Sequence, residues 1–103
     1  MLSKKEKNNL LKVLMLKDKV KVNNFYNKNQ FVIYTESATI FQSYKSIICI
    51  LLDGVLYIDK YYINYSKTTS KHLYLFIRDY TRLNVYTLKE LYEEIKNGTI
   101  KTY

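Results

Sequence analysis

The 103-residue chain lacks proline and tryptophan and has one cysteine, one histidine and two glycines. A single cysteine cannot form an internal disulfide, which excludes a disulfide scaffold and is typical of a reducing compartment. The longest apolar run, residues 47–52, is too short to cross a bilayer, and the polar first residues do not begin a secretory signal. We therefore expect a single cytoplasmic domain over residues 1–103, with no membrane segment.

Residues suited to catalysis are equally scarce. Cys49 lies in an apolar segment, where a buried thiol behaves as a small hydrophobic group with a raised pKa. His72 follows Lys71, whose positive charge opposes protonation of the imidazole. One cysteine and one histidine cannot anchor a structural zinc ion, and two isolated glycines do not make a phosphate-binding loop. The sequence thus predicts that the protein is not an enzyme and holds no metal or cofactor.

Positive charge is abundant, with 17 Lys and Arg against 9 Asp and Glu, a net charge of +8. A basic domain of this size attracts polyanions, nucleic acid above all, and most of the excess lies within residues 1–30. The lysines expected to steer a nucleic acid or nucleoprotein are Lys4, Lys5, Lys7, Lys12, Lys17, Lys19 and Lys21. Because specific phosphate readers favour Arg and this chain has only two, a merely solvated surface is the alternative. A coding sequence rich in A and T would produce the same bias towards Lys.

The first element expected is an amphipathic helix over residues 4–17. Ser3 and Glu6 have the spacing of a capping box, and apolar residues then recur with a helical period. These apolar residues are Leu10, Leu11, Leu14 and Met15. The lysine face opposite them is either a solvated face or a binding face.

The middle of the chain has the pattern of an antiparallel meander. Four asparagines between residues 23 and 29 predict a turn-rich stretch. The predicted strands are residues 30–35, 39–44, 46–52 and 55–59. The third is apolar on both faces, which indicates a central strand, and Asp53-Gly54 after it favours a two-residue hairpin.

Two further helices are predicted after this meander. Leu73, Phe76, Ile77 and Tyr80 lie on one helical face, although residues 73–77 would also alternate as a strand. Three possible caps, Ser66, Thr68 and Thr69, favour the helix. The last helix would begin at the capping box of Thr87 and Glu90, end at Asn97-Gly98 and precede a short edge strand over residues 99–103. The fold class expected is α+β: a four-stranded antiparallel meander with an N-terminal helix and two C-terminal helices.

Four short elements carry a resemblance to a known family. They are the FQSY run at residues 41–44, the pair Ile47-Ile48, the hairpin glycine Gly54, and YSKTTSKH at residues 65–72. With them, residues 23–78 resemble a family of small proteins from phages and mobile elements. The resemblance implies a protein that acts inside a bacterial cell, where such proteins commonly bind and block a host machine, including its defence nucleases.

Tyrosine is the most over-represented residue, with twelve copies, and several gather with lysines between residues 57 and 74. Tyr offers a large contact area with little entropy to lose, which suits a protein interface, and its ring can also stack on single-stranded nucleic acid. The residues expected to bind a partner are Tyr57, Lys60, Tyr61, Tyr62, Tyr65, Lys67, Lys71, His72 and Tyr74. The structural alternative is that most of these tyrosines pack the edge of the sheet.

Three functions remain open at this stage. The first is a phage-type, non-enzymatic inhibitor that binds a host protein or nucleoprotein, such as a CRISPR-type defence nuclease, through the Tyr- and Lys-rich segment. The second is a small nucleic-acid-binding protein or regulator. The third is a homodimer that pairs through an edge strand.

Overall fold

The structure is a computed structural model, and it describes residues 2–15 and 19–103, without the side chains of residues 11–15 and 19–20. Lys17, one of the expected steering residues, lies outside the described residues, and the side chains of Lys12 and Lys19 are not described either. The Cα radius of gyration is 12.8 Å. Within the described ranges, no helix is both long and apolar enough to cross a bilayer.

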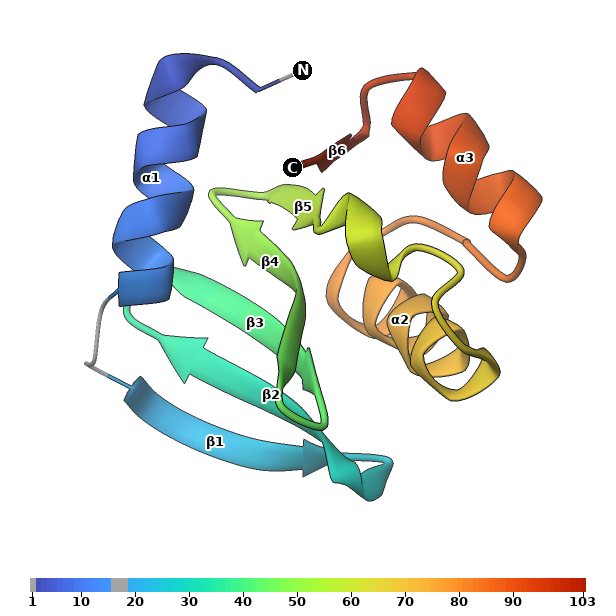
Figure 1. Cartoon of the computed structure of the whole chain (residues 1–103), viewed down its shortest axis with the longest axis horizontal. Helices are drawn as coiled ribbons and strands as arrows, with labels where there is room; N and C mark the ends of the chain where they lie inside the picture. The colour runs from blue at the N-terminus through green and yellow to red at the C-terminus, as the bar shows by residue number, and fades with distance from the viewer. Residues whose placement is uncertain (1, 16–18) are drawn as a thin grey trace.

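Within the described ranges, six strands form one mixed sheet at the centre of the molecule, and their spatial order follows the chain order. The strands are β1 (Lys19–Phe25), β2 (Asn27–Thr35), β3 (Ala38–Ser43), β4 (Ser46–Leu52), β5 (Val55–Ile58) and β6 (Ile100–Thr102). The first five pair antiparallel, whereas β6 returns to pair parallel with β5. Figure 1 shows this meander with β6 at its upper end.

The expected α+β meander is confirmed, but the prediction of four strands was wrong. Asn23 and Asn24, expected in a turn, lie in β1, where Asn24 pairs with Phe31 across the sheet. The turn falls instead at Tyr26, which has a φ of 65°. Strand formation depends on pairing and burial more than on intrinsic preference, so a neighbour as apolar as β2 can recruit an asparagine-rich segment.

The described residues form four helices: α1 (Lys4–Met15), the short 3₁₀ helix η1 (Lys60–Tyr62), α2 (Lys67–Tyr80) and α3 (Leu88–Lys96). The Ser66 hydroxyl accepts a hydrogen bond from the Thr69 N–H at 3.0 Å and begins α2, which confirms the helix over the alternative strand. The Thr87 hydroxyl caps α3 in the same way by accepting from the Glu90 N–H at 3.2 Å.

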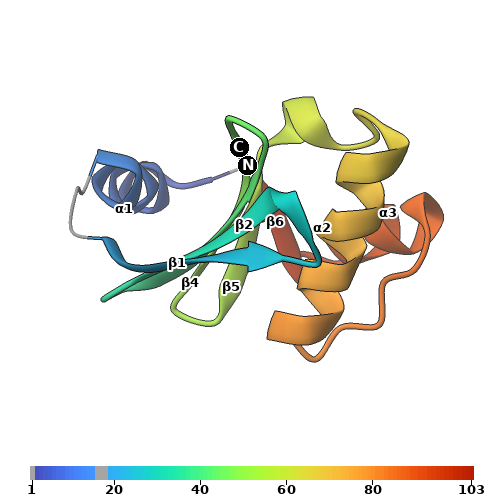
Figure 2. The ribbon, with the colours of Figure 1, turned by 90° about the horizontal axis from the view of Figure 1, so that it is seen from below.

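The helices form a layer on each face of the sheet, as Figure 2 shows: α1 covers one face, and α2 and α3 cover the other. Side chains of alternate strand positions therefore enter two separate cores. The core beneath α2 and α3 is rich in aromatic rings, with Phe41 stacked on Phe76 at a centroid distance of 5.7 Å. The core beneath α1 contains Leu10, with Ile40, Ile50 and other sheet residues.

Candidate partner-binding surface

The nine residues expected to bind a partner lie in three different environments. Tyr57 and His72 are buried, with only 7% and 5% of their surface exposed, too little for a partner to contact. Lys60, Tyr61, Tyr62 and Tyr65 surround η1, whereas Lys67, Lys71 and Tyr74 lie along the outer side of α2. The expectation that Tyr57 and His72 share this surface is therefore corrected.

Tyr57 belongs to the α1 side of the sheet. Its hydroxyl donates a hydrogen bond to Oε2 of Glu6 at 3.0 Å. Burial, and then this bond to a carboxylate, raises the pKa of Tyr57 to about 12. The side chain thus fixes α1 to β5, and the period-2 alternation of β5 places it on the face opposite α2.

His72 belongs to the packing between α2 and β2. Its Nδ1 lies 2.8 Å from the Thr68 carbonyl oxygen, which only accepts, so the proton is on Nδ1. Nε2 then accepts from the Asn27 side-chain amide at 3.4 Å. Both ring nitrogens are occupied inside the protein, which leaves His72 no group to offer a partner.

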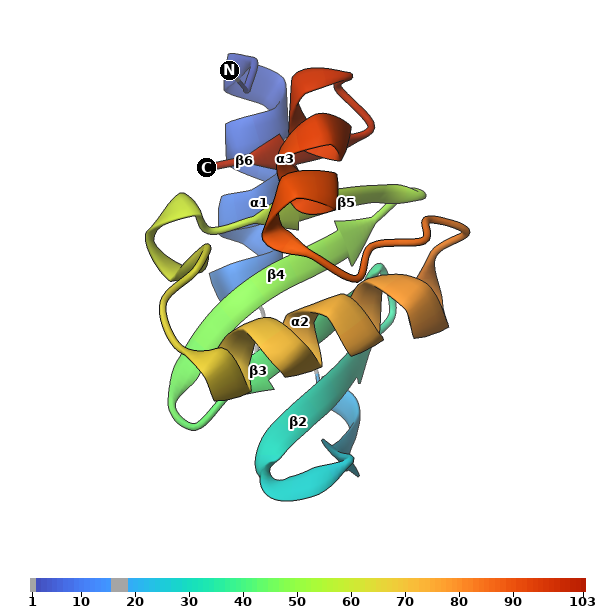
Figure 3. The ribbon, with the colours of Figure 1, turned by 90° about the vertical axis from the view of Figure 1, so that its right-hand side faces the viewer.

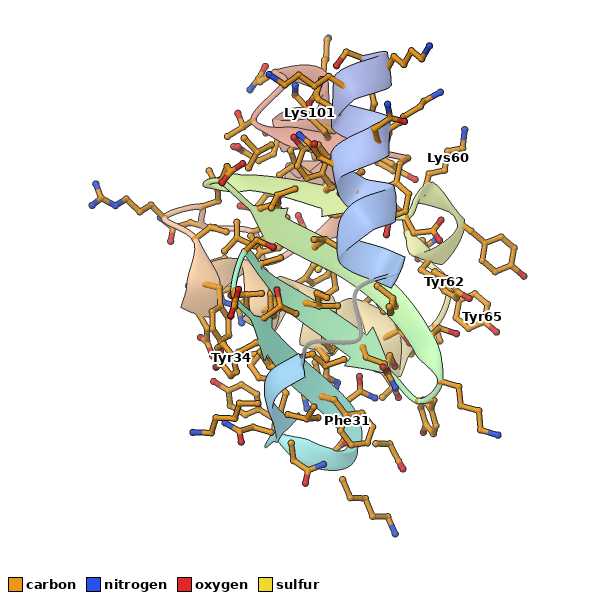
Figure 4. The ribbon with its side chains drawn as sticks, turned by 90° about the vertical axis from the view of Figure 1, so that its left-hand side faces the viewer. Phe31, Tyr34, Lys60, Tyr62, Tyr65 and Lys101 are labelled. Atoms are coloured by element: carbon orange, nitrogen blue, oxygen red, sulfur yellow. The ribbon has the colours of Figure 1, made fainter. Side chains whose placement is uncertain are left out.

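Three tyrosines around η1 form what we call the tyrosine cluster: Tyr61, Tyr62 and Tyr65. Their ring centroids are 4.9 to 5.8 Å apart, close enough for every ring to contact the other two. The Tyr62 hydroxyl donates to the Ser46 hydroxyl at 3.0 Å, which anchors the cluster to the sheet. Tyr61 and Tyr65 remain 69% and 58% exposed. Figure 4 shows Tyr62 and Tyr65 at one edge of the molecule, together with Lys60.

Local backbone geometry explains why the cluster forms. The Asp59 carboxylate accepts from the Tyr61 N–H at 3.0 Å and begins η1. Asn64, with a φ of 59°, then turns the chain towards α2, a conformation that asparagine tolerates better than most residues. The two turns bring residues 61, 62 and 65 to one side within a few residues of sequence.

A second exposed feature is a groove beside α2, which we call the α2 groove. It has a volume of about 600 Å³, and its charged and aromatic lining consists of Lys67, Lys71, Tyr74, Arg78 and Tyr86. The first four residues are spaced i, i+4, i+7 and i+11, so they form one stripe along the helix. Figure 3 shows α2 in front of the sheet, with the α2–α3 connection and α3 beside it.

Arg78 and Tyr86 were not among the site residues expected from the sequence. Helical spacing from Lys67, Lys71 and Tyr74 would have included Arg78. Helical spacing could not have included Tyr86, because it lies in the connection between α2 and α3, which passes beside the groove. There the Arg78 guanidinium lies 4.1 Å from the centre of the Tyr86 ring.

The lysines expected to steer a polyanion lie elsewhere. Lys4, Lys5 and Lys7 are exposed on α1, and Lys21 is exposed on β1. Since α1 and α2 cover opposite faces of the sheet (Figure 2), the basic stripe of α2 is not continuous with the lysines of α1. The described lysines of α1 and the basic stripe of α2 thus lie on different faces of the molecule.

The single cysteine lies in the interior of the molecule. Cys49 is completely buried in β4 as a free thiol, and desolvation raises its pKa well above the ordinary value. Within the part of the chain that the structure describes, no three His, Cys, Asp or Glu side chains gather as metal ligands do.

The fold and this surface define a small α+β protein with exposed tyrosine and lysine side chains around η1 and along α2. The chain belongs to a family of unknown function (DUF8033), which matches residues 13–95. The match extends from α1 almost to the end of α3, so it includes both the tyrosine cluster and the α2 groove. Comparison with curated proteins and with solved structures gave no match.

Proposed function

We propose that this protein is a non-enzymatic inhibitor of the phage type, which binds a host protein or nucleoprotein such as a CRISPR-type defence nuclease. The exposed tyrosine cluster is the single observation that carries the proposal. Tyr61 and Tyr65 expose more than half of their surface although each contacts two other rings. Tyr is enriched among the residues that dominate the affinity of protein interfaces.

The cluster is also held in place before any partner arrives. The contact of Tyr62 with Ser46 and the cap of η1 by Asp59 restrict the rings in the free protein. A partner would then lose less side-chain entropy on binding, which favours affinity. Lys60 is exposed beside the cluster (Figure 4) and favours a partner with negative charge.

The host partner is inferred from the resemblance of residues 23–78 to small proteins of phages and mobile elements. Such a protein acts in a bacterial cytoplasm, where it meets the defence machinery of its host. Binding without bond-making is sufficient for inhibition, and the surface described above offers contact area and charge for such binding.

The test is an interference assay in bacteria, in which a CRISPR-type nuclease attacks a targeted plasmid. We expect the wild-type protein to preserve the plasmid and the Tyr61→Ser/Tyr65→Ser variant to lose at least tenfold of that protection, as two interface hot spots would. Tyr92→Ser is the matched control, since Tyr92 is 51% exposed on α3, outside the tyrosine cluster. Equal protection by the double variant and the wild type would contradict the role of the cluster.

A photo-crosslinking amino acid at position 65 tests the partner itself. We expect a crosslink in host cells to a component of the nuclease complex, and none from position 92. A crosslink only to a second copy of the chain would overturn the proposal in favour of a homodimer.

A further inference from the structure

The α2 groove is lined by three cations as well as two aromatic rings, whereas the tyrosine cluster consists of rings alone. Lys67, Lys71 and Arg78 follow one another along the helix, with about 6 Å of helix rise between the first two and about 16 Å from first to last. No Asp or Glu is among the residues that line the groove. Among the described side chains, Lys101 and Glu6 form an ion pair on the α1 face, and no cation of the groove takes part in one. The three cations of the groove therefore keep their charge available for a ligand.

Arg78 is held in a fixed position at one end of this stripe. One of its guanidinium nitrogens donates to the Val85 carbonyl oxygen at 2.7 Å, and the guanidinium carbon lies over the Tyr86 ring, 4.1 Å from its centre. A carbonyl oxygen and an aromatic ring fix the side chain without neutralising it. The other guanidinium N–H groups can then bind an anion with little further loss of entropy.

Tyr86 adds an exposed aromatic ring to the groove, a feature that binding of a simple anion would not require. Arg78 covers one face of its ring, yet 61% of the residue remains exposed. A planar group can stack on the open face and complete a stack with the ring and the guanidinium. Tyr74 adds a second ring between Lys71 and Arg78 along the same stripe.

We propose that the α2 groove binds a single strand of nucleic acid, with phosphates on Lys67, Lys71 and Arg78 and a base stacked on Tyr86. A basic groove lined by aromatic rings is the general arrangement by which proteins bind single strands without sequence preference. An acidic peptide would use the cations but leave the ring unused, and a duplex would keep its bases inside the helix. The groove adjoins the tyrosine cluster at Asn64 and Ser66, but its proposed ligand contacts are other residues, so this inference does not depend on the proposed inhibition.

The test is fluorescence anisotropy with a labelled oligothymidine of about 15 nucleotides, a length that spans a typical single-strand site. Three phosphate contacts to a single strand predict a slope of about −2 for log K against log salt, or a loss of about twentyfold in affinity between 50 and 200 mM. Lys67→Gln/Lys71→Gln should weaken binding and reduce the slope to about −0.7. The matched control, Lys4→Gln/Lys5→Gln, removes the same charge from α1 and should retain the slope of the wild type.

Ring variants separate stacking from charge. Tyr86→Leu should lose about tenfold in affinity, whereas Tyr86→Phe should keep it, because the ring and not the hydroxyl stacks. Tyr61→Leu removes a ring from the tyrosine cluster and should bind the oligonucleotide as the wild type does. A circular dichroism melting curve for each variant shows whether it is folded.

Three results would overturn this inference. They are a lack of oligothymidine binding at 50 mM salt, equal or tighter binding of a duplex or of polyglutamate, and equal losses from the α1 and α2 lysine variants. Loss of nuclease inhibition in Tyr61→Ser/Tyr65→Ser with unchanged oligonucleotide binding would show that the two surfaces act separately. Unchanged inhibition in that variant would count against the proposed function alone.

Discussion

The two faces of the sheet are covered in different ways. The α2 face lies under two helices, and its core includes Phe25, Phe41 and Phe76 in edge and stacked contacts. The α1 face lies under one helix, and in Figure 4 Phe31 lies beyond the end of that helix. Both helices make hydrogen bonds to the sheet, such as Asn27 to His72 for α2. Aromatic packing adds to these bonds at α2, whereas an ion pair between Glu6 and Lys101 adds to them at the first turn of α1. The proposed binding residues of η1 and α2 adjoin the aromatic core.

The largest loss of stability is expected from a substitution in the aromatic core beneath α2 and α3. Phe76 is completely buried and stacks on Phe41 and on Tyr80, with centroid distances of 5.7 and 4.7 Å. Phe76→Ala would leave a cavity that the surrounding rings cannot fill, and should lower the free energy of unfolding by about 3–5 kcal/mol. Urea denaturation followed by circular dichroism measures this loss. A loss smaller than that of Leu10→Ala would contradict the view that the α2 face contributes more hydrophobic stability than the α1 face.

Leu10 is the corresponding test on the α1 face. It is 3% exposed in the core beneath α1. Leu10→Ala should cost about 2–3 kcal/mol, the low end of the range for buried leucine, because a single covering helix can shift to close the cavity. Amide NMR shifts should change in α1 and in the strand residues below it, and stay constant in α2. Shifts spread equally over both faces would show that the two cores are coupled.

The sequence predicts the local elements of this fold well because their signals are local. Side-chain caps at Ser3, Ser66 and Thr87 all begin helices, and Asp53-Gly54 has the two positive φ angles, 52° and 77°, of a tight hairpin. These features depend on residues within a few positions of each other. The structure of each could be worked out before the tertiary fold was known.

The remaining features depend on contacts between distant segments. The strand β1 pairs with β2, and β6 pairs with β5 although η1, α2 and α3 lie between them in the sequence. His72 is buried because Asn27 and the sheet cover it, although its charged neighbour Lys71 is exposed. The tyrosine–lysine segment was expected to form one surface, but helix periodicity distributes residues 67–74 between the core and the groove.

A smaller effect is expected at the beginning of α2. Ser66→Ala removes the hydroxyl that accepts from the Thr69 N–H, and should cost about 1 kcal/mol in the free energy of unfolding. Ser66 also lines the α2 groove, so the variant tests whether fraying of the first turn reaches the binding site. Thr87→Ala is the matched control, since it removes the same kind of cap from α3. If both variants destabilise equally and only Ser66→Ala weakens oligonucleotide binding, the cap also positions the groove.

The smallest effect is expected from the polar contacts that hold α1, and it depends on pH. Bonds from Lys101, then from the Ser3 N–H and the Tyr57 hydroxyl, lower the pKa of Glu6 from 4.5 to about 2. The folded state thus favours the carboxylate, so this contribution to stability is present above pH 4.5 and is lost as the pH falls from 4.5 towards 2. Glu6→Gln should lower the thermal midpoint at pH 7, and the difference from the wild type should shrink towards pH 2.

The same carboxylate shows how the two faces differ in their sensitivity to solvent. The Nζ of Lys101 lies 2.7 Å from Oε2 of Glu6, and both side chains are partly open to water, so salt should reduce the difference between wild type and Glu6→Gln at pH 7. Phe76→Ala provides the control, since the hydrophobic loss has no ion pair for salt to screen. A difference for Glu6→Gln that stays constant across both pH and salt would mean that the side chain acts by packing. In that case the ion pair of Glu6 would not distinguish the α1 face, and the contrast between the two faces would reduce to the number of helices and the aromatic packing beneath them.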